Sequence, residues 1–233
     1  MEFNEEQRCY IEAKDFDRFV LSENARDLGI RRARVVLRAL HALQAGEVLH
    51  PFRRGDRVVD RLVTRFGVRT ARFDKDLGFF LNDRPTKILG VCCHQDHAGV
   101  GAALPDGLQY YRIGRLKEMG ANAYRTSHNP PTPELLDACD SLGMLVMDEN
   151  RLPGSSPELL EQFARLVRRD RNRPSVILWS LGNEEYVIQN NEVGRNIARA
   201  LLRVQRELDP SRSATYGGNN GNQYEGINAE VPV

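Results

Sequence analysis

Val176-Ile177-Leu178-Trp179 is a short apolar run, and Ser180-Leu181-Gly182-Asn183-Glu184 follows it directly. Consecutive apolar residues bounded by polar ones predict a buried β-strand. A helical pattern then runs from about Gly194 to Leu208 and stops at Asp209-Pro210. A strand, a polar loop and a helix in this order form one βα unit, the building block of a parallel sheet.

Three similar units precede this one, starting near residue 85. Their predicted strands are 87–92, 122–125 and 144–147, and their predicted helices are 109–119, 132–142 and 155–167. Thr132 and Gly143 are the expected caps of the second of these helices. Ser155 and Glu158 have capping-box spacing at the start of the third. Ser213 to Tyr216 predicts the opening of a fifth strand.

This repeat predicts an α/β protein that contains a partial TIM (β/α)8 barrel. A whole barrel has about 250 residues, of which about 150 are present here, so we expect about the first four βα units. Upstream, Arg57 to Val63 alternates as a β-strand does. Residues 1–55 are charged, and their apolar residues follow a helical pattern at Val35, Val36, Leu37, Leu40 and Leu43. We predict a helical segment there and assign it no function.

The composition excludes several classes of protein. The 233 residues carry 33 basic and 32 acidic side chains, so the charge gives no case for nucleic acid or an anionic membrane as partner. No apolar run is long enough to cross a bilayer, and residues 1–6 are acidic and lack the apolar core of a signal peptide. The four cysteines include no C-x-x-C pair, which favours reduced thiols. We therefore expect a cytoplasmic protein.

Polar and titratable residues follow each predicted barrel strand where it ends. They are His94-Gln95-Asp96-His97, Ser127-His128-Asn129, Asp148-Glu149-Asn150 and Asn183-Glu184-Glu185. Barrel enzymes place their catalytic groups at the carboxyl ends of the strands. Three of the five histidines of the chain lie in these segments. The sequence therefore predicts a functional site on one rim of the barrel.

Each segment also has a plainer interpretation. Glu184 or Glu185 could be a charge at a helix N-terminus, where the helix dipole favours acidic residues. His94 and His97 could bind a metal with Cys92, Cys93 and Asp96, although no second ligand pair lies at a usual zinc spacing. The prolines after His128 could make that segment a simple turn. Trp179 fits the barrel core better than a platform on which a sugar stacks.

Several of these stretches together resemble the catalytic domain of glycoside hydrolase family 2. The stretches are residues 176–184, 90–97, 125–131 and 146–149, with residues 65–70 and 78–82 resembling the join to a preceding β-sandwich domain. The resemblance runs from about residue 56 to the C-terminus. It implies that residues 56–75 are a remnant of a β-sandwich domain and that residues 76–233 are the N-terminal half of the barrel. Gly182-Asn183-Glu184 resembles β-galactosidase-like members, because Glu185 stands where β-glucuronidase-like members have proline.

The resemblance implies retaining hydrolysis of a β-galactoside or a related oligosaccharide. Glu184 would be the catalytic acid and base. Asn183 would bind the 2-hydroxyl of the sugar, and His94, Arg125 and His128 would bind other hydroxyls.

A retaining enzyme also needs a carboxylate nucleophile, which in this family lies at the end of the seventh strand. We therefore expect that residue beyond the C-terminus of this chain, since neither Glu149 nor Asp96 matches its position. The chain alone would then be incomplete, and its open barrel edge could self-associate. The loop 151–155 lacks the acidic residue and histidine of the magnesium site of some members, so we predict no metal and no cofactor. The alternative is a non-catalytic carbohydrate-binding or complementation fragment.

Overall fold

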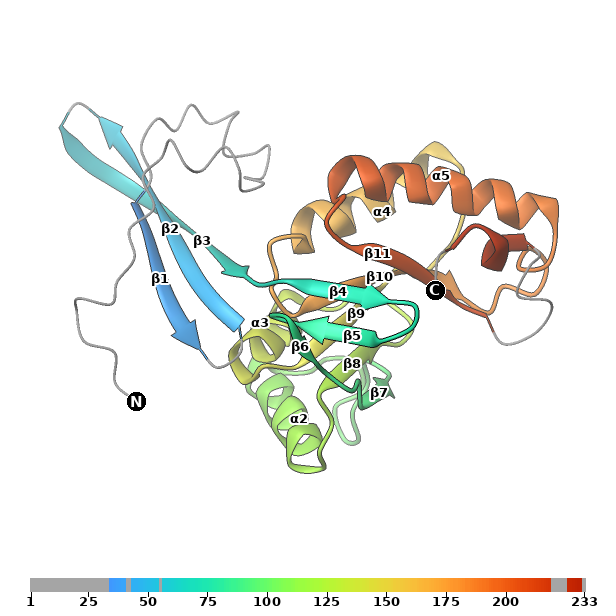
Figure 1. The fold of residues 1–233 in the computed structure, drawn as a ribbon. Helices are drawn as coiled ribbons and strands as arrows, with labels where there is room; N and C mark the ends of the chain where they lie inside the picture. Colours follow the sequence, from blue (N-terminus) through green and yellow to red (C-terminus); the bar gives the residue numbers. More distant parts are fainter. Residues whose placement is uncertain (1–33, 41–42, 55, 219–225, 232–233) are drawn as a thin grey trace. The chain divides into compact units, whose positions relative to one another are not determined.

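The computed structural model describes residues 34–40, 43–54, 56–218 and 226–231. The chain divides into two compact units. The first comprises residues 1–70 with 172–174, and the second comprises residues 71–171 with 175–233. Figure 1 shows the elements of both units.

The described part of the first unit is an antiparallel sheet. It contains β1 (Arg34–Leu40), β2 (Leu43–Arg54) and β3 (Arg57–Val68), in the order β1-β2-β3. The strand expected at residues 57–63 is confirmed within β3. The helical prediction for residues 1–55 is wrong over β1 and β2, and residues 1–33 lie outside the described residues. The β-branched Val35 and Val36 favour a strand, and pairing with β2 over the whole of β1 decides the outcome.

The second unit contains the predicted parallel sheet. Its strands are β7 (Gly90–Cys93), β8 (Ala123–Thr126), β9 (Leu145–Glu149), β10 (Val176–Asn183) and β11 (Ser213–Gly217). They lie side by side in chain order, and every pairing between neighbours is parallel. Strands in sequential order with helical crossovers form the beginning of a barrel. The predicted α/β fold class and the fifth strand are confirmed.

Helices connect successive strands of this sheet. They are α2 (Asp106–Glu118), α3 (Pro133–Leu142), α4 (Pro157–Asp170) and α5 (Glu192–Leu208), and the short 3-10 helix η3 (Gly226–Ala229) follows β11. Thr132 caps α3 by accepting a hydrogen bond from Leu135 N–H, and Gly143 ends that helix at a φ of 70°, as expected. The N-cap of α4 is Ser156 rather than Ser155. Pro157 sets this position, because proline is favoured at the first helical residue.

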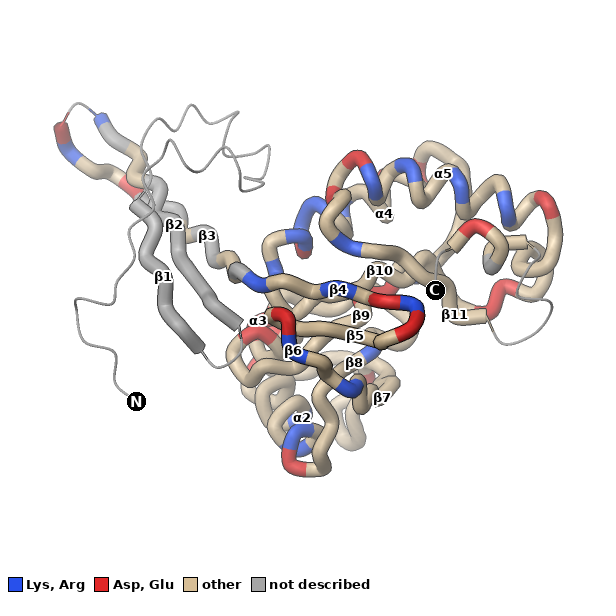
Figure 2. Tube along the Cα trace, viewed as in Figure 1, with Lys and Arg blue, Asp and Glu red and all other residues tan. Residues whose placement is uncertain are grey.

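The main core lies between the sheet and the helices. Trp179 is fully buried there, as predicted, together with Phe163 of α4 and Leu201 of α5. The indole Nε1–H of Trp179 donates to the carboxylate of Asp209 at 2.9 Å. Along α4 and α5, basic and acidic residues are interspersed (Figure 2). Among the described residues, no helix is both long and apolar enough to span a bilayer.

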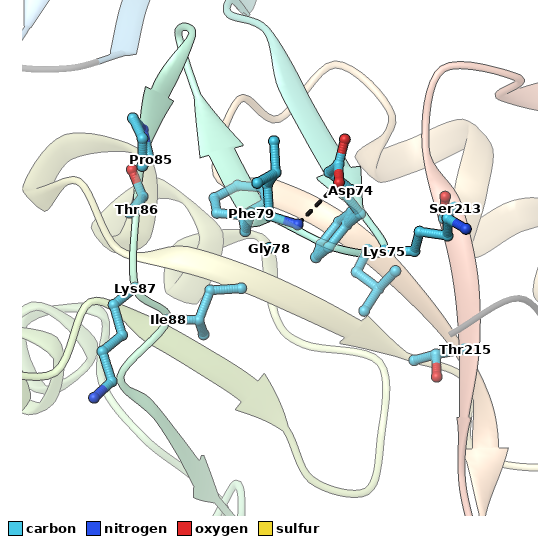
Figure 3. A pocket seen from close by; sticks show the side chains of 13 residues that line it. Asp74, Lys75, Gly78, Phe79, Pro85, Thr86, Lys87, Ile88, Ser213 and Thr215 are labelled. Atoms are coloured by element: carbon cyan, nitrogen blue, oxygen red, sulfur yellow. Dashed lines mark hydrogen bonds between the residues drawn. The ribbon is translucent and has the colours of Figure 1, made fainter.

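A small antiparallel sheet lies near the amino ends of the barrel strands. It covers the face of the parallel sheet opposite the helices. It consists of β4 (Ala71–Asp74), β5 (Gly78–Leu81) and β6 (Arg84–Pro85). Phe79 of β5 packs on Ala123, Leu145 and Ile177 in a second apolar cluster. A cavity of about 960 Å³ lies beside this cluster. Figure 3 shows residues 85–88 on one side of it and Ser213 and Thr215 on the other.

Asp148 of β9 is a buried acid between the sheet and α4. Neither of its carboxyl oxygens has a hydrogen-bond donor among the described residues. Burial is the main cause that raises the pKa of Asp148 well above its usual range, and the adjacent Asp170 carboxylate raises it further. Because the folded state favours the protonated acid, Asp148 stabilises the fold at low pH, and this contribution is lost as the pH rises through the folded pKa.

We expect Asp148→Asn to flatten the pH dependence of stability. The amide is neutral at every pH, so the variant should gain stability relative to the parent as the pH rises from 5 to 8. Urea unfolding of the purified chain at several pH values measures this difference. Asp76→Asn, at an exposed carboxyl of the small sheet, is the matched control and should leave the pH dependence unchanged. A parallel decline of stability in the parent and Asp148→Asn would contradict the prediction.

Candidate active site

The carboxyl ends of the parallel strands place the predicted residues on one rim. Arg125 lies in β8, Asn183 ends β10, and Glu184 follows it directly. His94 and His128 lie in the loops after β7 and β8. These loops are tied together, because Asn129 Nδ2 donates to Gln95 Oε1 at 2.9 Å.

Glu149, at the end of β9, is the centre of the network on this rim. Its side chain is completely buried. Arg125 Nε donates to its Oε2 at 2.6 Å, and Ser180 Oγ donates to the same oxygen at 2.9 Å. His128 Nδ1 lies 2.6 Å from its Oε1. A buried carboxylate requires such partners, because an unpaired charge in the interior is strongly unfavourable.

The central role of Glu149 was not predicted from the sequence. The sequence placed it among the polar residues at the strand ends and gave no reason to regard it as the nucleophile. Its oxygens contact Arg125, Ser180 and His128, and its side chain is 0% exposed, so it presents no accessible oxygen to a sugar on the rim. The only sequence signal for its role was its place at a strand end, shared with several other polar residues. Which of them binds Arg125 and His128 depends on the side chains that face the inside of the barrel.

Arg125 joins Glu149 to Asn183. Besides its bond to Glu149, it donates from Nη2 to Asn183 Oδ1 at 2.5 Å. This bond occupies the carbonyl oxygen of the Asn183 side chain and leaves its Nδ2–H₂ group as a donor. Gly217 of β11 makes room for the guanidinium, since a Cβ at this position would overlap Arg125 Nη2. A side chain at residue 217 would therefore displace the guanidinium of Arg125 from this position.

The two predicted histidines lie next to each other. The rings of His94 and His128 meet edge to face, with their centroids 5.2 Å apart. Because His128 Nδ1 contacts Glu149, its Nε2 is the ring nitrogen left for a substrate hydroxyl. Arg112 Nη2 donates to His94 O at 2.6 Å and so holds the loop after β7. In the described parts of the chain, no group of three or more His, Cys, Asp or Glu side chains is placed to hold a metal ion.

Glu184 has an unusual backbone conformation. Its φ is 48°, in the left-handed region, which costs a non-glycine residue about 1–2 kcal/mol. Its N–H donates to Gly217 O at 2.9 Å, and the next N–H, of Glu185, donates to Tyr216 Oη at 2.7 Å. Strained residues of this kind occur most often at functional sites. The Glu184 side chain is exposed on the rim.

The interpretation of Glu184 as a helix-terminal charge is wrong. The helix α5 begins at Glu192, with Asn191 as its N-cap. Residues 184–190 form a separate loop between β10 and that cap. The acidic residue in the first turn of the helix is Glu192, so the helix dipole does not explain Glu184 or Glu185.

Tyr216 lies beneath the start of this loop. Its side chain is 7% exposed. Burial raises the pKa of its hydroxyl, the hydrogen bond from Glu185 N–H lowers it, and the carboxylates of Glu185, Glu184 and Glu149 raise it further. The phenol therefore stays protonated beside the rim carboxylates.

The comparisons with known proteins agree on one family. The family model described as glycosyl hydrolases family 2, TIM barrel domain, matches residues 74–157 and 152–231. A β-galactosidase of Bacteroides ovatus is 35% identical over 211 residues, which cover 72% of this chain and 25% of that protein. A putative β-glucuronidase of Formosa agariphila is 35% identical over 179 residues, covering 71% of this chain and 16% of that protein.

Solved structures show the same relationship. A glycosyl hydrolase family 2 member from Bacteroides cellulosilyticus superposes with a TM-score of 0.70 at 37% identity, covering 77% of this chain and 25% of that one. A second structure is Bacteroides uniformis β-glucuronidase 2, covalently bound to cyclophellitol-6-carboxylate aziridine. It superposes with a TM-score of 0.66 at 32% identity, covering 78% of this chain and 24% of that one. The chain thus spans about a quarter or less of the length of these relatives. It belongs to glycosyl hydrolase family 2, and its parallel sheet and helices are part of the TIM barrel domain of that family.

Proposed function

We propose that this chain supplies the acid/base half of a retaining β-galactosidase site. The observation that carries the proposal is the placement of Glu184, which is exposed on the rim directly after Asn183 and held there by β11. A general acid must reach the leaving oxygen, and a carboxyl on the open rim at a strand end can do so. Glu184 would protonate the leaving group and then take a proton from the attacking water.

The neighbouring groups fit recognition of a sugar. The Asn183 Nδ2–H₂ group, whose partner oxygen is fixed by Arg125, would donate to the 2-hydroxyl. His94 and His128 would contact further hydroxyls. Arg125 would fix the side chains of Asn183 and Glu149 in the positions that this binding needs. Such hydrogen bonds are specific because a buried polar site rejects a ligand that leaves its groups unpaired.

The retaining mechanism requires a second carboxylate about 5–5.5 Å from the acid. The Glu149 side chain is 0% exposed and its oxygens contact Arg125, His128 and Ser180, which argues against Glu149 in this role. We therefore propose that the nucleophile comes from outside residues 1–233. A relative that is covalently bound to a cyclophellitol aziridine supports a mechanism with a covalent intermediate.

The named relatives include both β-galactosidases and β-glucuronidases, so the glycone needs a direct test. A suitable protein is a fused barrel, in which the chain is followed by the part of the Bacteroides ovatus β-galactosidase that lies beyond the matched segment. We expect this fused barrel to hydrolyse a nitrophenyl β-galactoside faster than the corresponding β-glucuronide, and the chain alone to hydrolyse neither. Hydrolysis by the chain alone would contradict the proposal that the nucleophile comes from outside residues 1–233. Galactose binding without turnover in both forms would favour a non-catalytic carbohydrate-binding fragment.

We further propose that the site works without a metal ion. The oxygens of Glu149 that could bind magnesium already contact Arg125, Ser180 and His128. Magnesium prefers oxygen ligands that are free to coordinate it. We expect the unfolding midpoint of the chain, and the activity of the fused barrel, to be the same in EDTA and in magnesium chloride. A saturable rise of the midpoint with magnesium would contradict this expectation.

A further inference from the structure

The loop that carries Glu184 is attached at both of its ends. At its far end, Ile227 N–H of η3 donates to Gln189 O at 3.1 Å. Between these ends, Tyr186 is 67% exposed and Val187 is 84% exposed. The side chains in the middle of the loop therefore lie open to solvent. Glu185 O accepts from Ile188 N–H and Gln189 N–H within the loop, and the N–H groups of Glu184 and Glu185 contact β11.

Those contacts come from Tyr216 and Gly217. The Gly217 carbonyl accepts from Glu184 N–H at 2.9 Å, and the Tyr216 hydroxyl accepts from Glu185 N–H at 2.7 Å. The first is a backbone contact that any residue could make. The second is made by one side chain, so a substitution that removes the hydroxyl removes it.

We propose that Tyr216 is a positioning residue for the acid/base Glu184. This inference rests on the proposed function of Glu184. The Tyr216 hydroxyl fixes the peptide between Glu184 and Glu185, and this peptide sets the direction in which the Glu184 carboxyl leaves the backbone. Glu184 stands at a φ of 48°, a conformation that relaxes readily when its surroundings do not hold it. Tyr216 contacts the loop through the backbone N–H of Glu185, so its role requires no contact with the sugar.

Burial suits the phenol to this task. Tyr216 packs in the main core, so its hydroxyl has little freedom to move. Burial and the nearby carboxylates raise the pKa of this hydroxyl, which keeps it neutral beside Glu184. A neutral hydroxyl accepts from the peptide without adding a second negative charge next to the acid.

The first test measures the contact itself in the purified chain. Tyr216→Phe keeps the ring in the core and removes only the hydroxyl, so hydrogen exchange at the Glu185 amide should accelerate. The matched control is Tyr124→Phe, which removes another buried phenol hydroxyl, one that donates to Cys93 O at 3.2 Å. This control should leave exchange at Glu185 unchanged. Unchanged exchange at Glu185 in Tyr216→Phe would overturn the inference, whether or not the protein is an enzyme.

The second test measures catalysis in the fused barrel. In Tyr216→Phe we expect kcat to fall about tenfold, because a small misplacement of a catalytic group is costly, while KM changes less than about twofold. Tyr124→Phe should keep the parental kcat. An unchanged kcat in Tyr216→Phe, in a parent that is active, would overturn the positioning role alone. Absence of hydrolysis by the parent would instead overturn the proposed function, and the inference with it.

Discussion

Glu184→Gln is expected to cause the largest loss of galactoside hydrolysis in the fused barrel. Glutamine keeps the size of the side chain but cannot give up or take a proton at neutral pH. General acid/base catalysis contributes about 10²–10⁴-fold to the rate, and kcat should fall by an amount in that range. The loss of kcat/KM, which reports formation of the covalent intermediate, should be smaller for a substrate whose leaving group needs no protonation, such as a dinitrophenyl galactoside. Steady-state kinetics with both substrates measures the difference.

The adjacent Glu185→Gln is the matched control for this experiment. It removes one carboxylate from the same loop, and the backbone N–H of residue 185 that binds Tyr216 is retained. We expect its kcat to stay within a few-fold of the parent. If the two variants lost activity equally, or if Glu185→Gln lost more, the assignment of the acid/base role to Glu184 would be wrong.

Glu149→Ala is expected to have the largest effect on stability. It removes the partner of Arg125 and His128 and leaves the Arg125 guanidinium largely buried without its carboxylate. Breaking a buried ion pair on one side costs about 3–5 kcal/mol. The free energy of unfolding, measured by urea denaturation of the purified chain, should decrease by that amount.

Glu207→Ala, at an exposed position on α5, is the control for this measurement. A surface substitution of this kind usually changes stability by no more than about 0.5 kcal/mol. A loss below about 1 kcal/mol in Glu149→Ala would show that the network around Glu149 contributes little to the folded state. The same variant should also weaken sugar binding, because Arg125 holds Asn183 through its second bond.

Local sequence patterns were sufficient for much of the fold. The apolar run 176–179 and the polar residues after it predicted both a strand and its place in a parallel sheet. Thr132 and Gly143 marked the ends of one helix, because caps depend on residues within a few positions of each other. The motif around Glu184 carried the family resemblance, which the family model then confirmed.

Local patterns failed where pairing between distant segments decides the conformation. Residues 35–43 have a helical spacing of apolar side chains, but β1 forms because β2 is available to pair with it. A short apolar run is compatible with both structures, and the partner strand makes the difference. The N-cap of α4 was misplaced by one residue for a smaller reason, since Ser155 and Ser156 are equally good caps until Pro157 is considered.

The sequence by itself determined the order of strands and helices, the family and the position of Glu184, because these depend on residues that are neighbours in the chain. Only the tertiary structure showed that Glu149 binds Arg125 and His128, that Gly217 leaves room for Arg125, and that the Tyr216 hydroxyl accepts from Glu185 N–H. These relations join residues that are between 21 and 92 positions apart, as for His128 with Glu149 and for Arg125 with Gly217. They arise because parallel strands bring their carboxyl ends to one rim, and no spacing along the chain encodes which side chains meet there.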